Sequence, residues 1–116
     1  MSKEEQRLQT SIVKYIKLAY PNTLFTATMG GVKLNSWSQR NALKSTGYLK
    51  GVADLLIFES KGMYKGLFIE LKTLKGKMTK EQKQFQTNAI ARGYLCVCCK
   101  GFDDTKKIID DYLNEI

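Results

Sequence analysis

Two apolar runs joined by a helical stretch constrain the fold of this 116-residue chain more than any other feature. The runs 67–71 and 94–99 have the length of strands, and residues 79–92 between them have the apolar spacing of a helix. Three side chains of that helix are expected to point inward, namely Phe85, Ala89 and Ile90, and Gly93 to end it in a left-handed conformation. A strand that returns to its sheet through a helix makes a crossover, so we predict a layered α/β fold.

The remaining apolar patterns complete the predicted order of elements. Residues 3–19 have helical spacing and end before Pro21, and Leu24–Thr28 is a short run of strand type. Residues 52–58 form another strand-length run, joined to residues 67–71 by a hairpin. Asp103 or Asp104 is expected to cap a last helix, whose apolar residues are Ile108, Ile109, Tyr112, Leu113 and Ile116. The predicted fold is a mixed sheet of about four strands flanked by helices, in the order α-β-β-β-α-β-α, within one domain covering residues 1–116.

The segment from Met29 to Lys50 loses the apolar period and collects glycines and cations. A long functional loop is expected there, with a short helix around residues 38–44. Because this loop leads into the strand that begins near Asp54, it should border whatever site that strand carries.

Charge favours a polyanionic partner. The chain has 19 Lys and Arg against 11 Asp and Glu, a formal net charge of +8, which suits nucleic acid, although an anionic membrane surface would also attract it. No apolar run approaches the ~18 residues that span a bilayer, so we expect a cytoplasmic protein with no membrane partner.

Three cysteines lie close together at Cys96, Cys98 and Cys99, and the chain has no histidine. A zinc site usually needs two separated pairs of ligands. We interpret these residues as reduced, small apolar side chains in a buried strand.

The chemistry is concentrated in the segment Ile69-Glu70-Leu71-Lys72. Side chains two apart in a strand face the same side, so Glu70 and Lys72 project together, and hairpin pairing brings Asp54 beside Glu70. The oxygens of Asp54, Glu70 and the Leu71 carbonyl suit Mg²⁺ or Mn²⁺, the chemistry of phosphates, with Lys72 orienting water or stabilising developing negative charge. The structural alternative is an exposed ion pair beside a strand-start residue.

These residues carry a resemblance to a known family. The segments Gly51-Val-Ala-Asp54, Ile69-Glu70-Leu71-Lys72 and the later Gln82 resemble the G-x-x-D, E-x-K, Q pattern of VRR-NUC (virus-type replication-repair nuclease) domains. These domains belong to the PD-(D/E)xK nucleases, together with the archaeal Holliday junction resolvases. The resemblance covers nearly the whole chain; Ala53 departs from it, because the wider class often has proline there.

The resemblance implies a restriction-endonuclease-like core, with Asp54 and Glu70 as metal ligands and Lys72 as the catalytic lysine. It also implies a further acidic ligand from the first helix, for which Glu5 lies on the inward stripe and Glu4 is the alternative. Gln82 has two possible roles, since Thr79-Lys-Glu-Gln82 also fits a capping box.

DNA contacts are expected from cations near the site, with the aromatic residues Trp37 and Tyr48 interleaved among those of the loop, against the alternative of a solvated loop. The cations are Lys33, Arg40, Lys44, Lys50, Lys75 and Lys77. The family implies branched DNA such as Holliday junctions or flaps, and a bacterial or phage setting. Paired cuts across a junction would need two sites, so we expect a homodimer with twofold symmetry. The competing hypothesis is a basic nucleic-acid-binding module whose acidic cluster is structural.

Overall fold

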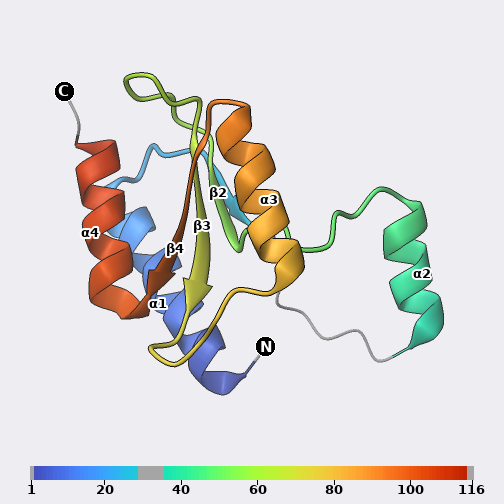
Figure 1. Ribbon diagram of the computed structural model, residues 1–116. Helices are drawn as coiled ribbons and strands as arrows, with labels where there is room; N and C mark the ends of the chain where they lie inside the picture. Colours follow the sequence, from blue (N-terminus) through green and yellow to red (C-terminus); the bar gives the residue numbers. More distant parts are fainter. Residues whose placement is uncertain (1, 29–35, 115–116) are drawn as a thin grey trace.

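The computed structural model describes residues 2–28 and 36–114, and it has the mixed α/β architecture that the sequence predicts (Figure 1). In chain order its elements are α1 (Lys3–Ala19), β1 (Phe25–Ala27), α2 (Trp37–Ser45), β2 (Leu55–Ile57), β3 (Leu67–Lys72), α3 (Lys80–Ala91), β4 (Leu95–Lys100) and α4 (Gly101–Leu113). The short helix expected within residues 29–50 is α2. Ile116, expected on the last helix, lies outside the described residues.

The four strands form one sheet in the order β1-β2-β3-β4. β1 and β2 are antiparallel, as are β2 and β3, and the second pair is the predicted hairpin. β4 lies parallel to β3, because α3 carries the chain from the end of β3 back to the end of the sheet where β3 begins. β3 is therefore an inner strand, and Leu67 to Leu71 are all buried.

Alternate residues of β3 face two different packing layers. The odd-numbered residues Leu67, Ile69 and Leu71 pack with the buried residues of α1 and α4, namely Ile12, Ile16, Ile109 and Tyr112. The even-numbered Phe68 packs on the other face with Ala89 of α3. Figure 1 shows the same division, with α1 and α4 on one side of the sheet and α3 on the other. Glu70 has the parity of Phe68 and so lies on the α3 side.

Several predicted details are wrong. β2 is shorter than the predicted run 52–58, because Gly51 has φ +91° and the chain reaches extended pairing only at Leu55. Ile90 is 54% exposed, since Phe85 and Ala89, four residues apart, already define the inward side of α3. Neither Asp103 nor Asp104 is the N-cap of α4. The N-cap is Lys100, whose backbone N–H donates a hydrogen bond to the carboxylate of Asp104.

None of the helices in the described ranges combines the length and the apolar character needed to cross a membrane.

A polar cluster fastens the end of α1 to α4. Asp110 accepts hydrogen bonds from the hydroxyl groups of Tyr15 and Tyr20 and from the ammonium of Lys106. Desolvation alone would raise the pKa of Asp110, but the bonds from Lys106, Tyr15 and Tyr20 together lower it to about 2. The charged carboxylate is therefore the form that stabilises this contact.

We expect Asp110→Ala to lower the free energy of unfolding by about 2 kcal/mol at pH 7, because it leaves two tyrosine hydroxyls without their acceptor. The pKa of Asp110 is depressed in the folded protein, so its contribution is present above the ordinary value and is lost as the pH falls from about 4 towards 2. Urea unfolding at a series of pH values measures both effects. Asp111→Ala is the matched control: this residue pairs with Lys107 on the surface, and the substitution should change nothing measurable. Equal losses from the two variants would contradict the assignment.

Candidate active site

Two buried carboxylates lie together where β2 begins and β3 ends. Leu55 pairs with Ile69 in the antiparallel register, so the preceding Asp54 lies beside Glu70. Asp54 is 7% exposed and Glu70 is 3% exposed. The structure thus brings together the two carboxylates that the sequence analysis selected, on the face of the sheet that α3 covers.

Backbone hydrogen bonding fixes Asp54 in place. Its Oδ2 accepts a hydrogen bond from the backbone N–H of Leu71 at 2.7 Å. On the other side, the backbone carbonyl of Asp54 accepts a bond from Thr28. The carboxylate therefore lies against the last part of β3, at the residue whose carbonyl was selected as a possible metal ligand.

Glu70 is held in an environment that opposes its negative charge. Burial raises its pKa, the neighbouring Asp54 raises it further, and Lys72 lowers it, with a net result of about 9. Without a cation, the two neighbouring carboxyl groups therefore hold a proton more readily than isolated carboxyl groups do. Two buried carboxyl groups in contact are the arrangement that a divalent cation relieves, and their oxygen atoms are the donors that Mg²⁺ and Mn²⁺ prefer. The residues present therefore fit such an ion.

Lys72 lies on the same face and reaches Glu70. Its Nζ is 3.7 Å from Glu70 Oε1, and its side chain is 14% exposed. Gly76 approaches the stem of this lysine, since a Cβ there would lie 3.1 Å from Lys72 Cβ. The loop after β3 therefore covers the aliphatic part of Lys72.

Gln82 makes both kinds of contact that the sequence left open. The side-chain Oε1 of Gln82 accepts a hydrogen bond from the backbone N–H of Thr79 at 2.8 Å. The backbone N–H of Gln82 donates to the hydroxyl of Thr79, which completes the capping box of α3. Its Nε2 also donates to Glu70 Oε1 at 2.8 Å. One side chain therefore ties the start of α3 to the carboxylate pair.

The glycine of the G-x-x-D segment has a packing role that sequence reasoning missed. Gly51 has φ +91°, and a Cβ there would lie 2.4 Å from the carbonyl oxygen of Glu81. Only glycine lets the chain pass this close to the first turn of α3. This contact places Asp54, three residues later, and Gln82 in the same small region.

Glu5 does not join the pair in this arrangement. Its side chain accepts a hydrogen bond from the backbone of Ser2 in the capping box of α1, and it is half-buried, whereas Glu4 is exposed. Within residues 2–28 and 36–114, no group of three or more His, Cys, Asp or Glu side chains is close enough to hold a metal ion. Magnesium is commonly held by one or two carboxylates with water and phosphate oxygens, so Asp54 and Glu70 meet that minimum.

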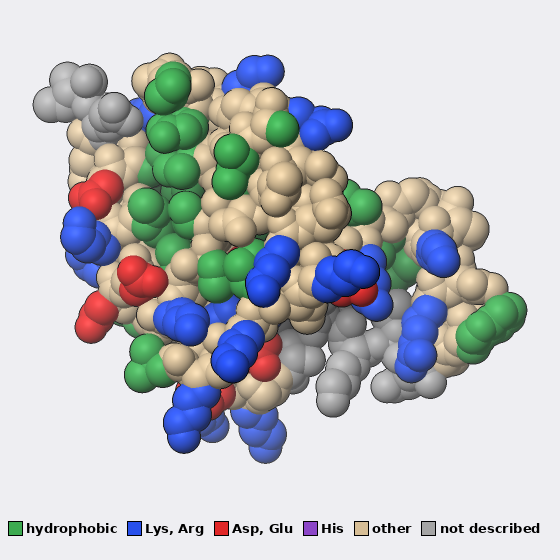
Figure 2. Space-filling model, in the orientation of Figure 1, with side chains coloured by type: hydrophobic (Ala, Val, Ile, Leu, Met, Phe, Trp, Pro, Cys, Tyr) green, Lys and Arg blue, Asp and Glu red, His purple; other side chains and the backbone are tan. Residues whose placement is uncertain are grey.

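The residues expected to contact DNA are exposed but dispersed. Trp37 is 76% exposed, and it lies with Arg40 and Lys44 on α2, which stands away from the sheet and has no buried residue (Figure 1). Lys50 pairs with Glu81 at 3.7 Å. Lys75 and Lys77 are exposed on the loop after β3, and Lys33 lies outside the described residues. In the view of Figure 2, Lys and Arg side chains line the lower edge of the molecule, where β3 ends.

Two further residues lie near the candidate site: Lys100, a neighbour of Lys72 that was not selected from the sequence, and Tyr48, an aromatic residue of the loop expected to contact DNA. Lys100 pairs with Lys72 in the parallel register and is exposed. Tyr48 is half-buried, and its pKa is raised by burial and then by the charges of Asp54 and Glu70. The parallel crossover was the signal that could have identified Lys100, but the predicted strand stopped one residue earlier, at Cys99.

The cysteines are free side chains of β4. Cys96 and Cys99 are buried, and burial raises the pKa of these thiols to about 11 and about 12. They remain protonated at neutral pH and behave as small apolar groups.

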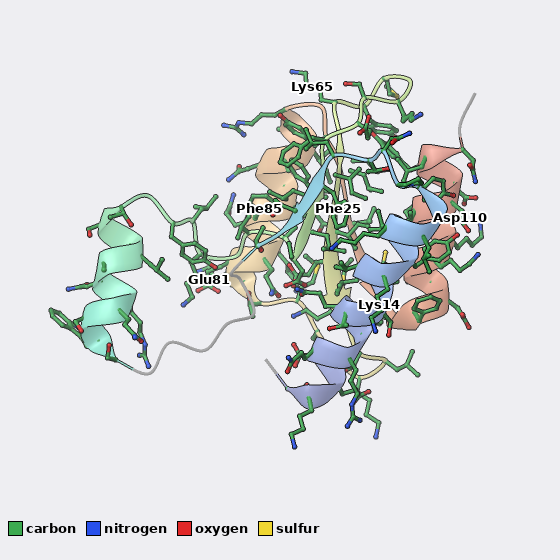
Figure 3. All side chains as sticks on the ribbon, turned by 180° about the vertical axis from the view of Figure 1, so that it is seen from behind. Lys14, Phe25, Lys65, Glu81, Phe85 and Asp110 are labelled. Atoms are coloured by element: carbon green, nitrogen blue, oxygen red, sulfur yellow. The ribbon has the colours of Figure 1, made fainter. Side chains whose placement is uncertain are left out.

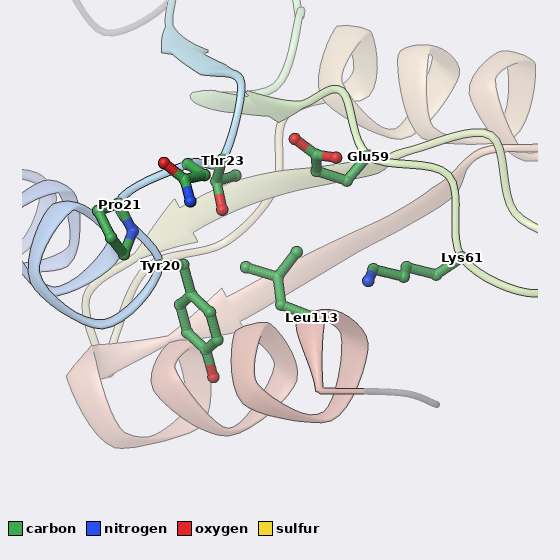
Figure 4. A pocket seen from close by; sticks show the side chains of 7 residues that line it. Tyr20, Pro21, Thr23, Glu59, Lys61 and Leu113 are labelled. Atoms are coloured by element: carbon green, nitrogen blue, oxygen red, sulfur yellow. The ribbon is translucent and has the colours of Figure 1, made fainter.

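A separate hollow of about 240 Å³ lies between the end of α1 and the connection from β2 to β3 (Figure 4). Two of its polar side chains are bonded within the protein: the Tyr20 hydroxyl donates to Asp110, and Glu59 accepts from the backbone of Leu24. These contacts stabilise the fold and leave the carboxylate pair as the candidate site.

Comparisons with known proteins identify the family and support the fold. The model of the VRR-NUC domain family matches residues 2–103. A solved structure named VRR_NUC domain protein superimposes with a TM-score of 0.80 at 23% identity, covering 98% of this chain and 91% of its own. A second, named VRR_NUC domain, gives a TM-score of 0.59 at 22% identity, with coverages of 96% and 99%. At these identities the structural likeness shows the fold. No curated protein matches the chain.

We expect Glu70→Gln to stabilise the protein in metal-free buffer, by on the order of 2 kcal/mol at pH 8. The raised pKa of Glu70 means that stability is lost as the pH rises from the ordinary value near 4.5 towards 9, whereas glutamine carries no charge to lose. The glutamine oxygen can still accept from Gln82. Thermal unfolding of both proteins with a chelator present measures the gain, which should shrink towards pH 5. A variant less stable than the wild type at pH 8 would contradict this description of the pair.

We expect Gly51→Ala to cost about 3 kcal/mol of stability, from the strained backbone and the clash with the backbone of Glu81 together. Gly47→Ala is the matched control, since Gly47 also has positive φ but a Cβ there would meet nothing within 4 Å. It should cost about 1 kcal/mol, from backbone strain alone. Chemical denaturation of both variants measures the difference, and equal losses would show that the contact with α3 is unimportant.

Proposed function

The chain belongs to the VRR-NUC domain family, a family of nuclease-type domains, and we propose that it is a metal-dependent endonuclease that hydrolyses phosphodiester bonds in branched DNA. The observation that carries the proposal is the contact of two buried carboxylates, Asp54 and Glu70, with Lys72 at the end of the central strand. An acidic pair of this kind is costly to bury and has a clear use in phosphate chemistry.

The ion would be Mg²⁺ or Mn²⁺, held by Asp54, Glu70 and the Leu71 carbonyl. When bound, it would polarise the scissile phosphate and make a nearby water more acidic. Asp54 is fixed for this role by the N–H of Leu71, and Glu70 is fixed by Gln82.

Lys72 would act on the reacting phosphate directly. Its ammonium is compact, carries three donors and is held beside Glu70, so it can orient the attacking water or stabilise charge developing on the phosphate oxygens. Water oxygen adds to phosphorus, the bond to one sugar oxygen breaks, and the leaving strand takes up a proton. Gln82 would hold Glu70 in position during this reaction.

Branched DNA is the proposed substrate, and a bacterial or phage-infected cell is the proposed setting. The exposed cations of the loop after β3 offer phosphate contacts next to the end of β3. Those of α2, with Trp37, offer phosphate contacts and a stacking surface on a helix that stands away from the sheet. A homodimer with twofold symmetry would supply the second site that paired cuts across a four-way junction require.

The competing proposal, a basic binding module, differs in what Lys72 does. We expect Lys72→Ala to reduce cleavage by about 100-fold or more while leaving most of the DNA affinity, because one lysine is a small part of the counterion-release term. The assay offers labelled four-way junction, 5′ flap, 3′ flap, duplex and single-stranded DNA with Mg²⁺, Mn²⁺ or a chelator. Lys107→Ala, a surface lysine of α4, is the control.

Symmetric nicks in the junction alone would identify a resolvase, and cuts near a single-stranded branch would identify a flap nuclease. Cleavage that survives Lys72→Ala would remove this lysine from the mechanism. Wild-type protein that binds these DNAs but cuts none of them with either metal would favour the binding module.

A further inference from the structure

The outer side of α1 carries a line of cations that the proposed function does not use. Lys3, Arg7, Lys14 and Lys17 are all exposed, and their spacing of four, seven and three residues keeps them on one side of the helix. Thr10 occupies the gap between Arg7 and Lys14 on the same line. We call these four cations the basic ridge.

The basic ridge has no internal electrostatic partner in the described part of the chain. None of the ion pairs found there involves any of its four residues. The contrast with α4 is informative, because Lys106 and Lys107 each pair with an aspartate four residues later. The acidic residues of α1 are Glu4 and Glu5 in its first turn, and neither lies on the ridge line.

Polar groups beside the ridge are suited to phosphate. A shallow hollow of about 550 Å³ is lined by three ridge cations together with hydroxyl and amide side chains: Lys3, Gln6, Arg7, Thr10, Ser11 and Lys14. Phosphate contacts in DNA complexes come from this mixture of cations, hydroxyls and amides. A purely apolar partner would leave these groups unsatisfied.

The ridge begins at the end of the molecule that carries the candidate active site. Figures 1 and 3 show the first turns of α1 at the end of the sheet where β3 finishes, and Lys14 further along the same helix. However, α1 packs on the face of the sheet opposite α3. From Lys3 to Lys17 the helix rises roughly 21 Å, which is about six base pairs of duplex.

We propose that the basic ridge binds the phosphate backbone of a second duplex arm of a branched DNA, not the arm that lies in the active site. This inference rests on the proposed function for its substrate. Because the ridge and the carboxylates share one end of the molecule but lie on different sides of it, two arms that diverge at a branch can occupy both. A straight duplex of moderate length cannot follow both surfaces.

The test compares two triple variants with equal loss of charge. The ridge variant carries Lys3→Gln, Arg7→Gln and Lys14→Gln. The control carries Lys65→Gln, Lys83→Gln and Arg92→Gln, exposed cations away from α1, with Lys65 at the opposite end of the molecule (Figure 3). Equilibrium binding to a labelled four-way junction is measured with a chelator present, so that cleavage plays no part, over a series of salt concentrations.

We expect the ridge variant to reduce the slope of log affinity against log salt by about 2 to 3, since each phosphate contact contributes about 0.9. The control should change it by less than 1. On a linear duplex of the length of one arm, the ridge variant should bind almost as well as the wild type. Thermal unfolding of the ridge variant should match that of the wild type, which shows that the fold is intact.

Equal effects of the two variants on the junction would mean that only net charge matters, and would overturn the proposal. An equal loss on the linear duplex would overturn the assignment to a second arm. Ridge-dependent binding to vesicles of anionic lipid, with junction binding unchanged, would assign α1 to a membrane surface instead. If the wild type cuts no DNA, the proposed function fails, while the binding comparison still decides whether the ridge contacts a junction.

Discussion

The structure depends on placing two carboxylates side by side, away from water, at the end of its most buried strand. Burial and the neighbouring Asp54 together raise the pKa of Glu70, which reaches about 9 even though Lys72 lowers it. The surrounding donors offset part of this cost: the N–H of Leu71, the amide of Gln82 and the ammonium of Lys72 all point at the pair. They provide one full positive charge against two potential negative ones, which leaves the site suited to a divalent cation.

The donors reach the pair because backbone contacts bring three elements to one point. β3 brings Glu70 and Lys72, the chain entering β2 brings Asp54, and the first turn of α3 brings Gln82. The close approach of Gly51 to Glu81 joins the second of these to the third, and the capping box fixes the direction of the Gln82 side chain. Gln82 therefore caps α3 and contacts Glu70 at the same time, so the two roles that the sequence offered for it are not alternatives.

The sequence predicted the elements and the pairing of Asp54, Glu70 and Lys72 because both follow from local periodicity and from one hairpin. It did not predict the end of β2, the exposure of Ile90 or the packing of Gly51, because these depend on how α3 lies against the sheet. Lys100 escaped for a related reason: its position beside Lys72 is a consequence of parallel register, which no local pattern encodes. The hydrogen bonds of Asp110 with Tyr15 and Tyr20 join residues about 90 positions apart, and no local sequence pattern predicts them.

The positive and negative charges of the protein lie in different places: most cations are exposed on the surface, whereas Asp54 and Glu70 are buried. The net charge of +8 resides mostly on exposed side chains, which act on a polyanion over about a Debye length and weaken as salt rises. The acidic pair is buried, so its electrostatic interactions are with close neighbours inside the protein, and salt screens them less. Lys72 lies between the basic surface and the acidic pair, because the loop at Gly76 covers its aliphatic stem and its ammonium contacts Glu70. Lys72 therefore places a positive charge beside the buried carboxylates, so that the acidic pair and the basic surface of the protein meet at this residue.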